Sequence, residues 1–220
     1  MPLSKRQASE FEAAIAEYDF PAVYFDFRGS VEGRAGNMLA VEAAIREMLV
    51  STGIERVRDG LANVIYWGYA QIGYRDNRVR RFRNSVTDDQ LGRFLALLGA
   101  GDPVGLGTLA ALRLPEFSGM SFISKVLAFL DPARYCVLDK QLLKLAAVSG
   151  SRALHRLSSG TQIAVTANNE RAYDAWREEC ADISAQYFGS RYRVVDVERG
   201  FCQLVQAGRL AVVQELYLAA

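Results

Sequence analysis

Apolar residues recur every three or four positions along most of the chain, the spacing that places them on one face of a helix. The pattern is clearest in residues 37–50 and 54–72, and in the second segment Val57, Leu61 and Ile65 share a face. Similar patterns predict helices over residues 4–18, 88–98, 104–112, 121–131, 137–147, 168–187 and 196–207. The chain is therefore predicted to be mainly α-helical.

Two of these helices begin with a recognisable side-chain pattern. Ser4 is followed three residues later by Gln7, and Thr87 by Gln90. In such a capping box the hydroxyl and the amide side chain bond backbone N–H groups that the first helical turn leaves unpaired. Both positions therefore predict helix starts.

One segment near the N-terminus has a different pattern. Residues 20–27 are rich in aromatic and β-branched side chains and contain Pro21. Such side chains favour strands, and proline in a sheet is confined to edges or to the first residue of a strand. An extended piece or a short edge strand is predicted here, ending at residues 28–30.

Length and composition indicate an ordinary folded protein. The chain has 220 residues, of which half are hydrophobic and 23% charged. This suffices for one globular unit over residues 1–220, built as two lobes that share a core. The formal net charge of +1 argues against binding nucleic acid by bulk attraction, but it allows a local basic face balanced by acidic helices elsewhere.

Cysteine and histidine usage excludes several kinds of site. The three cysteines, Cys136, Cys180 and Cys202, form no Cys-x-x-Cys pair, and His155 is the single histidine. A structural zinc or iron–sulfur site cannot be assembled from these residues, and neither metal nor cofactor is expected. A lone histidine is more often structural or at the surface than catalytic, and we expect this of His155.

The odd cysteine count also bears on location. The sequence shows no signal-like start and no apolar run near eighteen residues. We therefore expect a protein of the reducing cytoplasm that does not enter the membrane.

Lysine is rare and unevenly placed. Three of the four lysines fall between residues 125 and 144, while arginine supplies most of the positive charge elsewhere. An amine can lose its proton when desolvated and attack carbon, whereas a guanidinium stays protonated. Lys125 is therefore a candidate nucleophile. The alternative is a lysine on a core helix whose side chain reaches the solvent.

A turn precedes the helix that carries Lys125. Leu114-Pro115 closes one helix, and Gly119 permits the positive φ angle of a sharp turn. The amides of Gly119, Met120 and Ser121 would then point outward together at a helix start, which is a ready site for a phosphate. Small side chains on the Lys125 side of the following helix would leave room for a substrate.

The order of a helix, a turn, a second helix and a following aspartate, over about residues 104–147, resembles the helix-hairpin-helix DNA glycosylases. It is particularly similar to the oxoguanine glycosylase-like branch. Leu114-Pro115 and Gly119 correspond to the Leu-Pro-x-x-Gly hairpin of that family with one residue more before the glycine, Lys125 to its nucleophile and Asp139 to its aspartate. The chain departs from the family pattern in having Ser121 at the second hairpin glycine, a shorter interval between lysine and aspartate, and Gln141 where histidine or arginine is common.

The resemblance implies a two-lobed helical fold and a DNA glycosylase, with or without AP lyase activity. Its partner would be duplex DNA containing a modified base, flipped out of the stack, and no obligate protein partner is evident. Asp139 would stabilise positive charge at C1′ as the base leaves, and Lys125 would capture that carbon as a Schiff base. The alternatives are a non-catalytic hairpin module that binds DNA, and an interaction scaffold that does not. Asp139 would then only cap a helix.

Aromatic residues near the end of the 54–72 helix are followed by five arginines against one aspartate, Asp76. This suits phosphate contacts beside a base-stacking surface, but a core helix that leads into a solvated arginine loop would look the same. The base-pocket candidates are Phe122, Tyr66, Trp67 and Tyr69, and the DNA-backbone candidates are Arg78 and Arg81 together with the hairpin residues Gly119, Met120 and Ser121.

Overall fold

The computed structural model describes residues 2–220, which form ten α-helices, two short 3-10 helices and a two-stranded sheet. The predicted mainly α fold is confirmed. The chain divides into two compact units, one formed by Phe20–Leu130 and the other by the residues up to Asp19 together with Asp131–Ala220.

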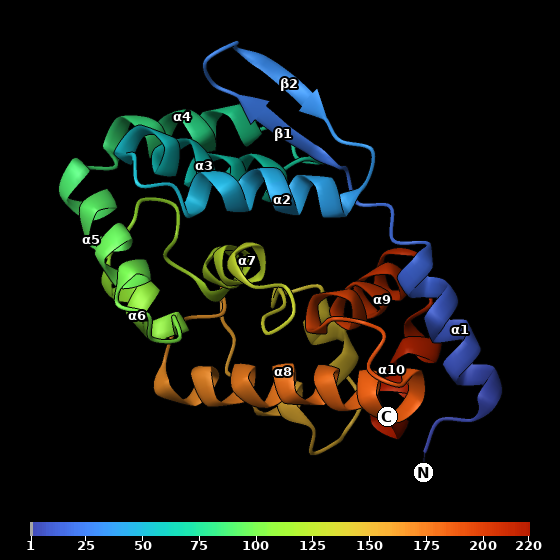
Figure 1. The fold of residues 1–220 in the computed structure, drawn as a ribbon. Helices are drawn as coiled ribbons and strands as arrows, with labels where there is room; N and C mark the ends of the chain where they lie inside the picture. The colour runs from blue at the N-terminus through green and yellow to red at the C-terminus, as the bar shows by residue number, and fades with distance from the viewer. Residues whose placement is uncertain (1) are drawn as a thin grey trace. The chain divides into compact units, whose positions relative to one another are not determined.

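The Phe20–Leu130 unit contains the β-hairpin and the helices that precede residue 131. Its elements are β1 (Val23–Asp26), β2 (Val31–Arg34), α2 (Met38–Leu49), α3 (Ile54–Gly68), α4 (Arg75–Ser85), α5 (Asp88–Gly99), α6 (Leu106–Ala111) and α7 (Met120–Leu130), as Figure 1 shows. Helix α3 is the core of this unit, because all its residues from Gly60 to Trp67 are buried and it contacts α2, α4, α5, α7 and β1.

The hairpin is attached to α3 by a buried amide. β1 and β2 pair antiparallel, from Val23 opposite Arg34 to Asp26 opposite Val31. The fully buried Asn63 of α3 accepts a hydrogen bond from the Phe25 N–H (2.6 Å) and donates one to the Phe25 carbonyl (3.0 Å). The side chain of Asn63 therefore satisfies the backbone groups on the edge of β1 that β2 does not cover.

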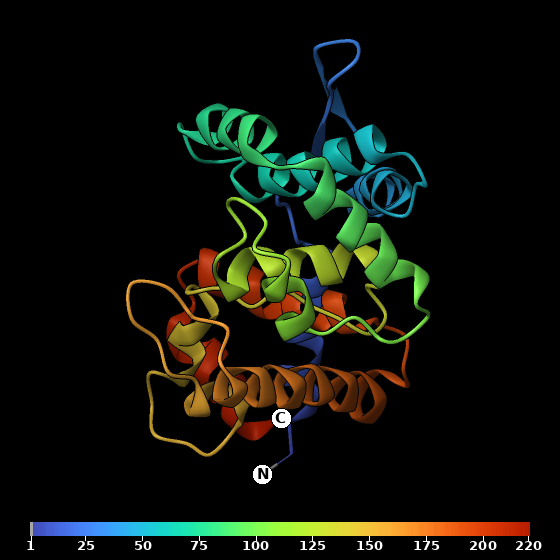
Figure 2. The same ribbon diagram turned by 90° about the vertical axis from the view of Figure 1, so that its left-hand side faces the viewer.

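The second unit is built around helix α9. Its elements are α1 (Lys5–Ala16), η1 (Leu142–Ala146), η2 (Ala153–Arg156), α8 (Ala167–Phe188), α9 (Val194–Gln206) and α10 (Leu210–Ala219). Phe201 of α9 contacts Phe11 of α1, Trp176 of α8 and Tyr217 of α10, with ring centroids 4.5, 5.6 and 5.8 Å apart. Figure 2 shows α8, the long helix of this unit, from the side.

Both predicted capping boxes are confirmed. Ser4 and Gln7 cap α1 reciprocally, and Thr87 and Gln90 do the same for α5. The predicted extended segment near residue 20 is present as β1.

Two predicted helices are corrected by the structure. The helix predicted over 54–72 ends at Gly68, and the arginine-rich segment after it is helix α4 rather than a loop. The helix predicted over 137–147 is absent, and only Leu142–Ala146 forms a 3-10 turn. Strand β2 and helix α10 were not predicted.

Among the helices described, none combines the length and the apolar character that crossing a lipid bilayer requires. The three cysteines are buried and form no disulfide bond. His155 lies in a packing contact, with its ring stacked on Tyr217 at 5.9 Å and its Nε2 atom 2.8 Å from the Val148 carbonyl.

Candidate functional site

Lys125 differs from the other lysines in its burial. Its residue surface is 6% exposed, whereas Lys5, Lys140 and Lys144 are all exposed. It lies in the middle of α7, a helix in which eight of eleven residues are buried. Placing an amine there costs free energy of desolvation, so its surroundings must compensate.

The amine of Lys125 lies against the first turn of its own helix. Nζ donates hydrogen bonds to the Ser121 hydroxyl at 3.0 Å and to the Ser121 carbonyl at 3.3 Å. Side chains of a helix lean toward its N-terminus, so residues four apart meet in this way. Nζ also lies 5.1 Å from the centre of the Phe122 ring, within the range of a cation–π contact.

Gly68, the last residue of α3, makes room for these side chains. A Cβ atom at this position would lie 2.7 Å from Cε1 of Phe122 and 3.2 Å from Cδ of Lys125. The first distance is shorter than carbon atoms tolerate, so any larger residue would displace the ring. Gly68 therefore allows Phe122 and Lys125 to pack against the end of α3.

The turn before α7 takes its shape from residues other than glycine. Within the described chain, the positive φ angles of this turn occur at Arg113 (51°) and Glu116 (68°). The Arg113 carbonyl accepts a hydrogen bond from Nε2 of Gln90 at 2.7 Å. Gly119 was predicted to supply the positive φ, and this prediction is corrected.

The residues predicted to bind phosphate begin helix α7. Gly119 and Ser121 are half-buried, while the Met120 residue is completely buried. The Gly119 carbonyl accepts the N–H of Ile123, as in a regular first turn. Phosphate binding by the amides of this turn stays a prediction.

Glu116 joins the turn to helix α4. Its side chain is 6% exposed, and its two oxygens accept Arg78 at 2.8 Å and Arg81 at 3.3 Å. The hydrogen bond to Glu116 raises the pKa of the Arg78 guanidinium. Arg78 and Arg81 thus lie beside the hairpin, but a carboxylate of the protein already contacts both.

The remaining arginines of α4 are also engaged. Arg75 contacts Glu32 at 3.2 Å, Arg83 is paired with Asp59, and Arg80 donates to Asn77. Each of these contacts involves an acidic or amide partner, so α4 is mostly a charge-balanced face. Arg81, with a side chain 64% exposed, and Arg80, an exposed residue, remain accessible to a phosphate.

The four predicted aromatic residues fall into two groups. Tyr69 and Phe122 are half-buried neighbours, with ring centroids 4.7 Å apart, and both lie near Lys125 and the turn. Tyr66 and Trp67 are each 4% exposed and packed in the core of the unit. Tyr66 donates its hydroxyl to Glu32, and burial together with this bond raises its pKa to about 12. That these two residues line a base pocket stays a prediction.

Asp139 lies in the other unit, and the boundary between the units falls between Leu130 and Asp131. Its proximity to Lys125 therefore stays a prediction. Asp139 is half-buried in an irregular segment, and its Oδ1 atom accepts the N–H of Gln141 at 2.9 Å. This local turn replaces the predicted helix start, because the carboxylate bonds an amide only two residues away. Burial raises the pKa of Tyr18 in the same unit, and the charges of Glu198 and Asp139 add to the effect.

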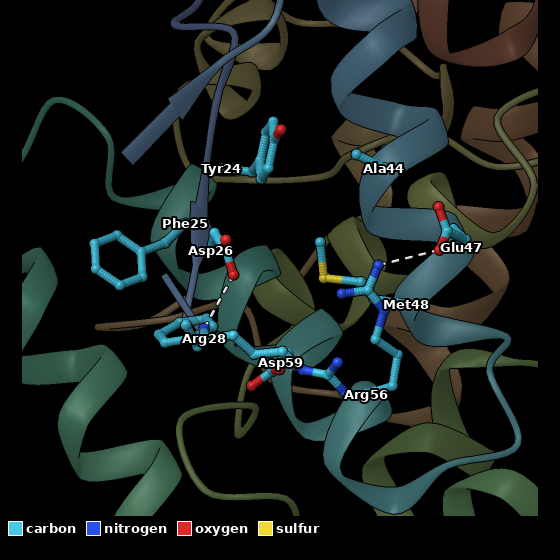
Figure 3. Close-up of a pocket in the computed structure, with 10 residues that line it drawn as sticks. Tyr24, Phe25, Asp26, Arg28, Ala44, Glu47, Met48, Arg56 and Asp59 are labelled. Atoms are coloured by element: carbon cyan, nitrogen blue, oxygen red, sulfur yellow. Dashed lines mark hydrogen bonds and ion pairs between the residues drawn. The ribbon is translucent and has the colours of Figure 1, made fainter. Parts of the chain in front are cut away.

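A separate cavity of about 380 Å³ lies between β1, α2 and α3 (Figure 3). Its wall contains Met48 and Tyr24 together with charged groups of both signs. Arg56 and Glu47 pair across its rim at 3.0 Å, and Asp26 accepts the Arg28 N–H at 3.0 Å. None of the predicted site residues lines it.

Other nucleophile and metal candidates are weaker. Burial raises the pKa of the Cys136 and Cys180 thiols, which keeps them in the unreactive form. Across residues 2–220, no group of three or more histidine, cysteine, aspartate or glutamate residues is arranged to hold a metal ion.

Two residues that contact the candidate site or its hairpin, Gly68 and Glu116, were not identified from the sequence. Gly68 had a signal, because a glycine inside a helical pattern often marks a close approach. Glu116 had none, because its partners lie 38 and 35 residues earlier in the chain.

Comparison with known proteins identifies no relative: no protein-family model, curated protein or solved structure matches the chain.

Proposed function

We propose that this protein is a DNA glycosylase that removes a modified base from duplex DNA, with Lys125 as nucleophile and Asp139 as its electrostatic partner. The observation that carries the proposal is the burial of Lys125. It is 6% exposed, while the other three lysines are exposed. Burying an amine costs free energy of desolvation, so the position of Lys125 calls for a reason.

The neighbourhood of Lys125 supports a role with DNA. The amine lies at the first turn of α7, directly after a turn whose amides are candidates for a phosphate. Tyr69 and Phe122 offer aromatic surface beside it, and the accessible Arg80 and Arg81 lie on α4. Phosphate contacts would position the duplex, and the aromatic rings would contact a flipped base.

The proposed reaction uses groups of this chain only. The lone pair of Nζ forms a bond to C1′ while the C1′–N bond to the base breaks, and the base leaves with that electron pair. The Asp139 carboxylate would stabilise the positive charge that develops on the sugar. One Nζ proton passes to the departing base. The C1′–O4′ bond then breaks as the nitrogen lone pair forms the C=N bond of the Schiff base, and the second Nζ proton passes to O4′.

Trapping with borohydride tests the nucleophile. We expect wild-type protein, incubated with duplexes that each carry one modified base, to form a covalent adduct when borohydride reduces the Schiff base. Lys125→Gln should form none, since glutamine has no amine. Lys144→Gln is the matched control, because Lys144 is exposed, and it should form as much adduct as wild type. An undiminished adduct in Lys125→Gln would place the nucleophile elsewhere.

Base release separates this proposal from a non-catalytic DNA-binding module. A glycosylase releases free base from randomly damaged DNA, and Lys125→Gln should not. A module would bind duplex with strong dependence on salt and release no base with either protein. A scaffold would not bind DNA even at low salt.

A further inference from the structure

We propose that Ser121 is the positioning residue for Lys125, whose amine it holds at the first turn of α7. The inference rests on the proposed function only in assigning the nucleophile to Lys125. The hydroxyl oxygen of Ser121 lies 3.0 Å from Nζ, a normal hydrogen-bond distance. Serine and lysine are one helical turn apart, so the contact forms within a single rigid element.

The hydroxyl is the better of the two acceptors that Ser121 offers. The Ser121 carbonyl lies 3.3 Å from Nζ and also accepts the Ser124 hydroxyl at 3.2 Å. A carbonyl has two lone pairs, and here it also lies at the position that accepts the helical N–H of residue 125. The hydroxyl oxygen, in contrast, is nearer to the amine.

The surrounding packing makes the contact effective. The Phe122 ring centre lies 5.1 Å from Nζ, and a Cβ atom at Gly68 would come within 3.2 Å of Cδ of Lys125. These neighbours restrict the aliphatic stem, and the Ser121 hydroxyl then fixes the tip. A held amine loses less freedom when it attacks carbon, and this raises the rate of the chemical step.

Steady-state kinetics provide the first test. Ser121→Ala removes one hydrogen bond to the amine, and we expect kcat to fall about tenfold with KM unchanged. Ser121→Thr keeps a hydroxyl at the same carbon and should restore kcat to within about threefold of wild type. Ser118→Ala, in the exposed part of the same turn, is the matched control. An unchanged kcat in Ser121→Ala, or a failure of Ser121→Thr to restore it, would overturn the inference.

The scarcity of lysine allows a second test that needs no DNA. Lysine-selective ¹³C labelling gives Cε–Hε signals from four residues only, and Lys125→Gln identifies the signal of interest. In wild type and Ser121→Thr the two Hε protons of Lys125 should have different shifts, because the amine is held. In Ser121→Ala the difference between the two shifts should become smaller. An unchanged difference in Ser121→Ala would contradict the proposal.

The two tests separate the two proposals. A held amine in the spectrum with no base release by any variant would remove the glycosylase and leave the positioning role. Base release that depends on Lys125 but not on Ser121 would remove the positioning role and leave the glycosylase.

Discussion

Helices α4 and α7 belong to the same unit and use positive charge in opposite ways. All five arginines of α4 contact acidic or amide side chains. Helix α7 has one cationic residue, which is 6% exposed and is held by a neighbouring hydroxyl. Two of the acidic partners, Glu116 and Asp59, have side chains only 6% and 10% exposed, so their ion pairs attach α4 to the rest of the unit. The lysine of α7 is instead buried, and contacts such as the one with the Ser121 hydroxyl must offset the desolvation of its amine.

Gly68→Ala should have the largest effect, because it changes the surroundings of Lys125 in α7. The added methyl group would lie 2.7 Å from Phe122 and force the ring to move, and Lys125 with it. Overpacking of this kind costs typically about 1–3 kcal/mol. We expect a loss of about 2 kcal/mol in the free energy of unfolding, measured with urea, and at least a tenfold loss of base release.

The matched control is Gly92→Ala in α5. A Cβ atom there meets nothing within 4 Å, so the change should stabilise the protein by about 0.5–1 kcal/mol through helix propensity. If Gly68→Ala behaved like this control, the close approach between α3 and α7 would not restrain the lysine.

Glu116→Gln tests the α4 side. The change removes the charge that two arginines share, and we expect a loss of about 1–2 kcal/mol in unfolding free energy, reduced by the exposure of Arg81. It also releases both guanidinium groups, so binding to duplex DNA should tighten and depend more steeply on salt. Fluorescence anisotropy at several salt concentrations measures both effects. Weaker binding would mean that the carboxylate orders the arginines for DNA rather than competing with it.

Tyr66→Phe should have the smallest effect and a defined pH dependence. The Tyr66 pKa is raised from 10.0 to about 12, chiefly by burial, so its contribution to stability is complete below pH 10 and declines as the pH rises toward 12. The Glu32 pKa is lowered from 4.5, chiefly by the Tyr66 hydroxyl, so that contribution declines as the pH falls below 4.5.

Wild type and Tyr66→Phe should therefore differ by about 1 kcal/mol between roughly pH 5 and pH 10. The difference should shrink at both ends of that range. Urea unfolding across the pH range measures it, and a constant difference would show that the hydroxyl and Glu32 are not coupled.

The predictable part of the fold is the part that local chemistry determines. The Ser4–Gln7 and Thr87–Gln90 boxes each lie within four residues, and both cap helices as predicted. The helix predicted over 137–147 failed because the Asp139 carboxylate bonds a nearby amide and starts a turn instead. Strand β2 was missed because it has four residues, one of them glycine, and no clear alternation.

The helix that carries the candidate site could be predicted from the sequence, but the contacts that other elements make with it could not. Lys125 and Ser121 are four residues apart, so their contact follows from helix geometry. The burial of Tyr66 and Trp67 and the pairing of Glu116 with α4 depend on helices that meet only in the folded chain. The hydrophobic periodicity of the sequence does not indicate which helices will contact each other.

The left-handed backbone of Glu116 shows that the shape of a loop can depend on a distant charge. Glycine would adopt a φ of 68° without steric penalty, whereas a residue with a side chain pays about 1 kcal/mol or more for it. In this conformation the Glu116 side chain contacts both guanidinium groups. The ion pairs of Glu116 thus offset the cost of its backbone conformation. A glycine substitution would relax the loop locally and remove its ion pairs with α4.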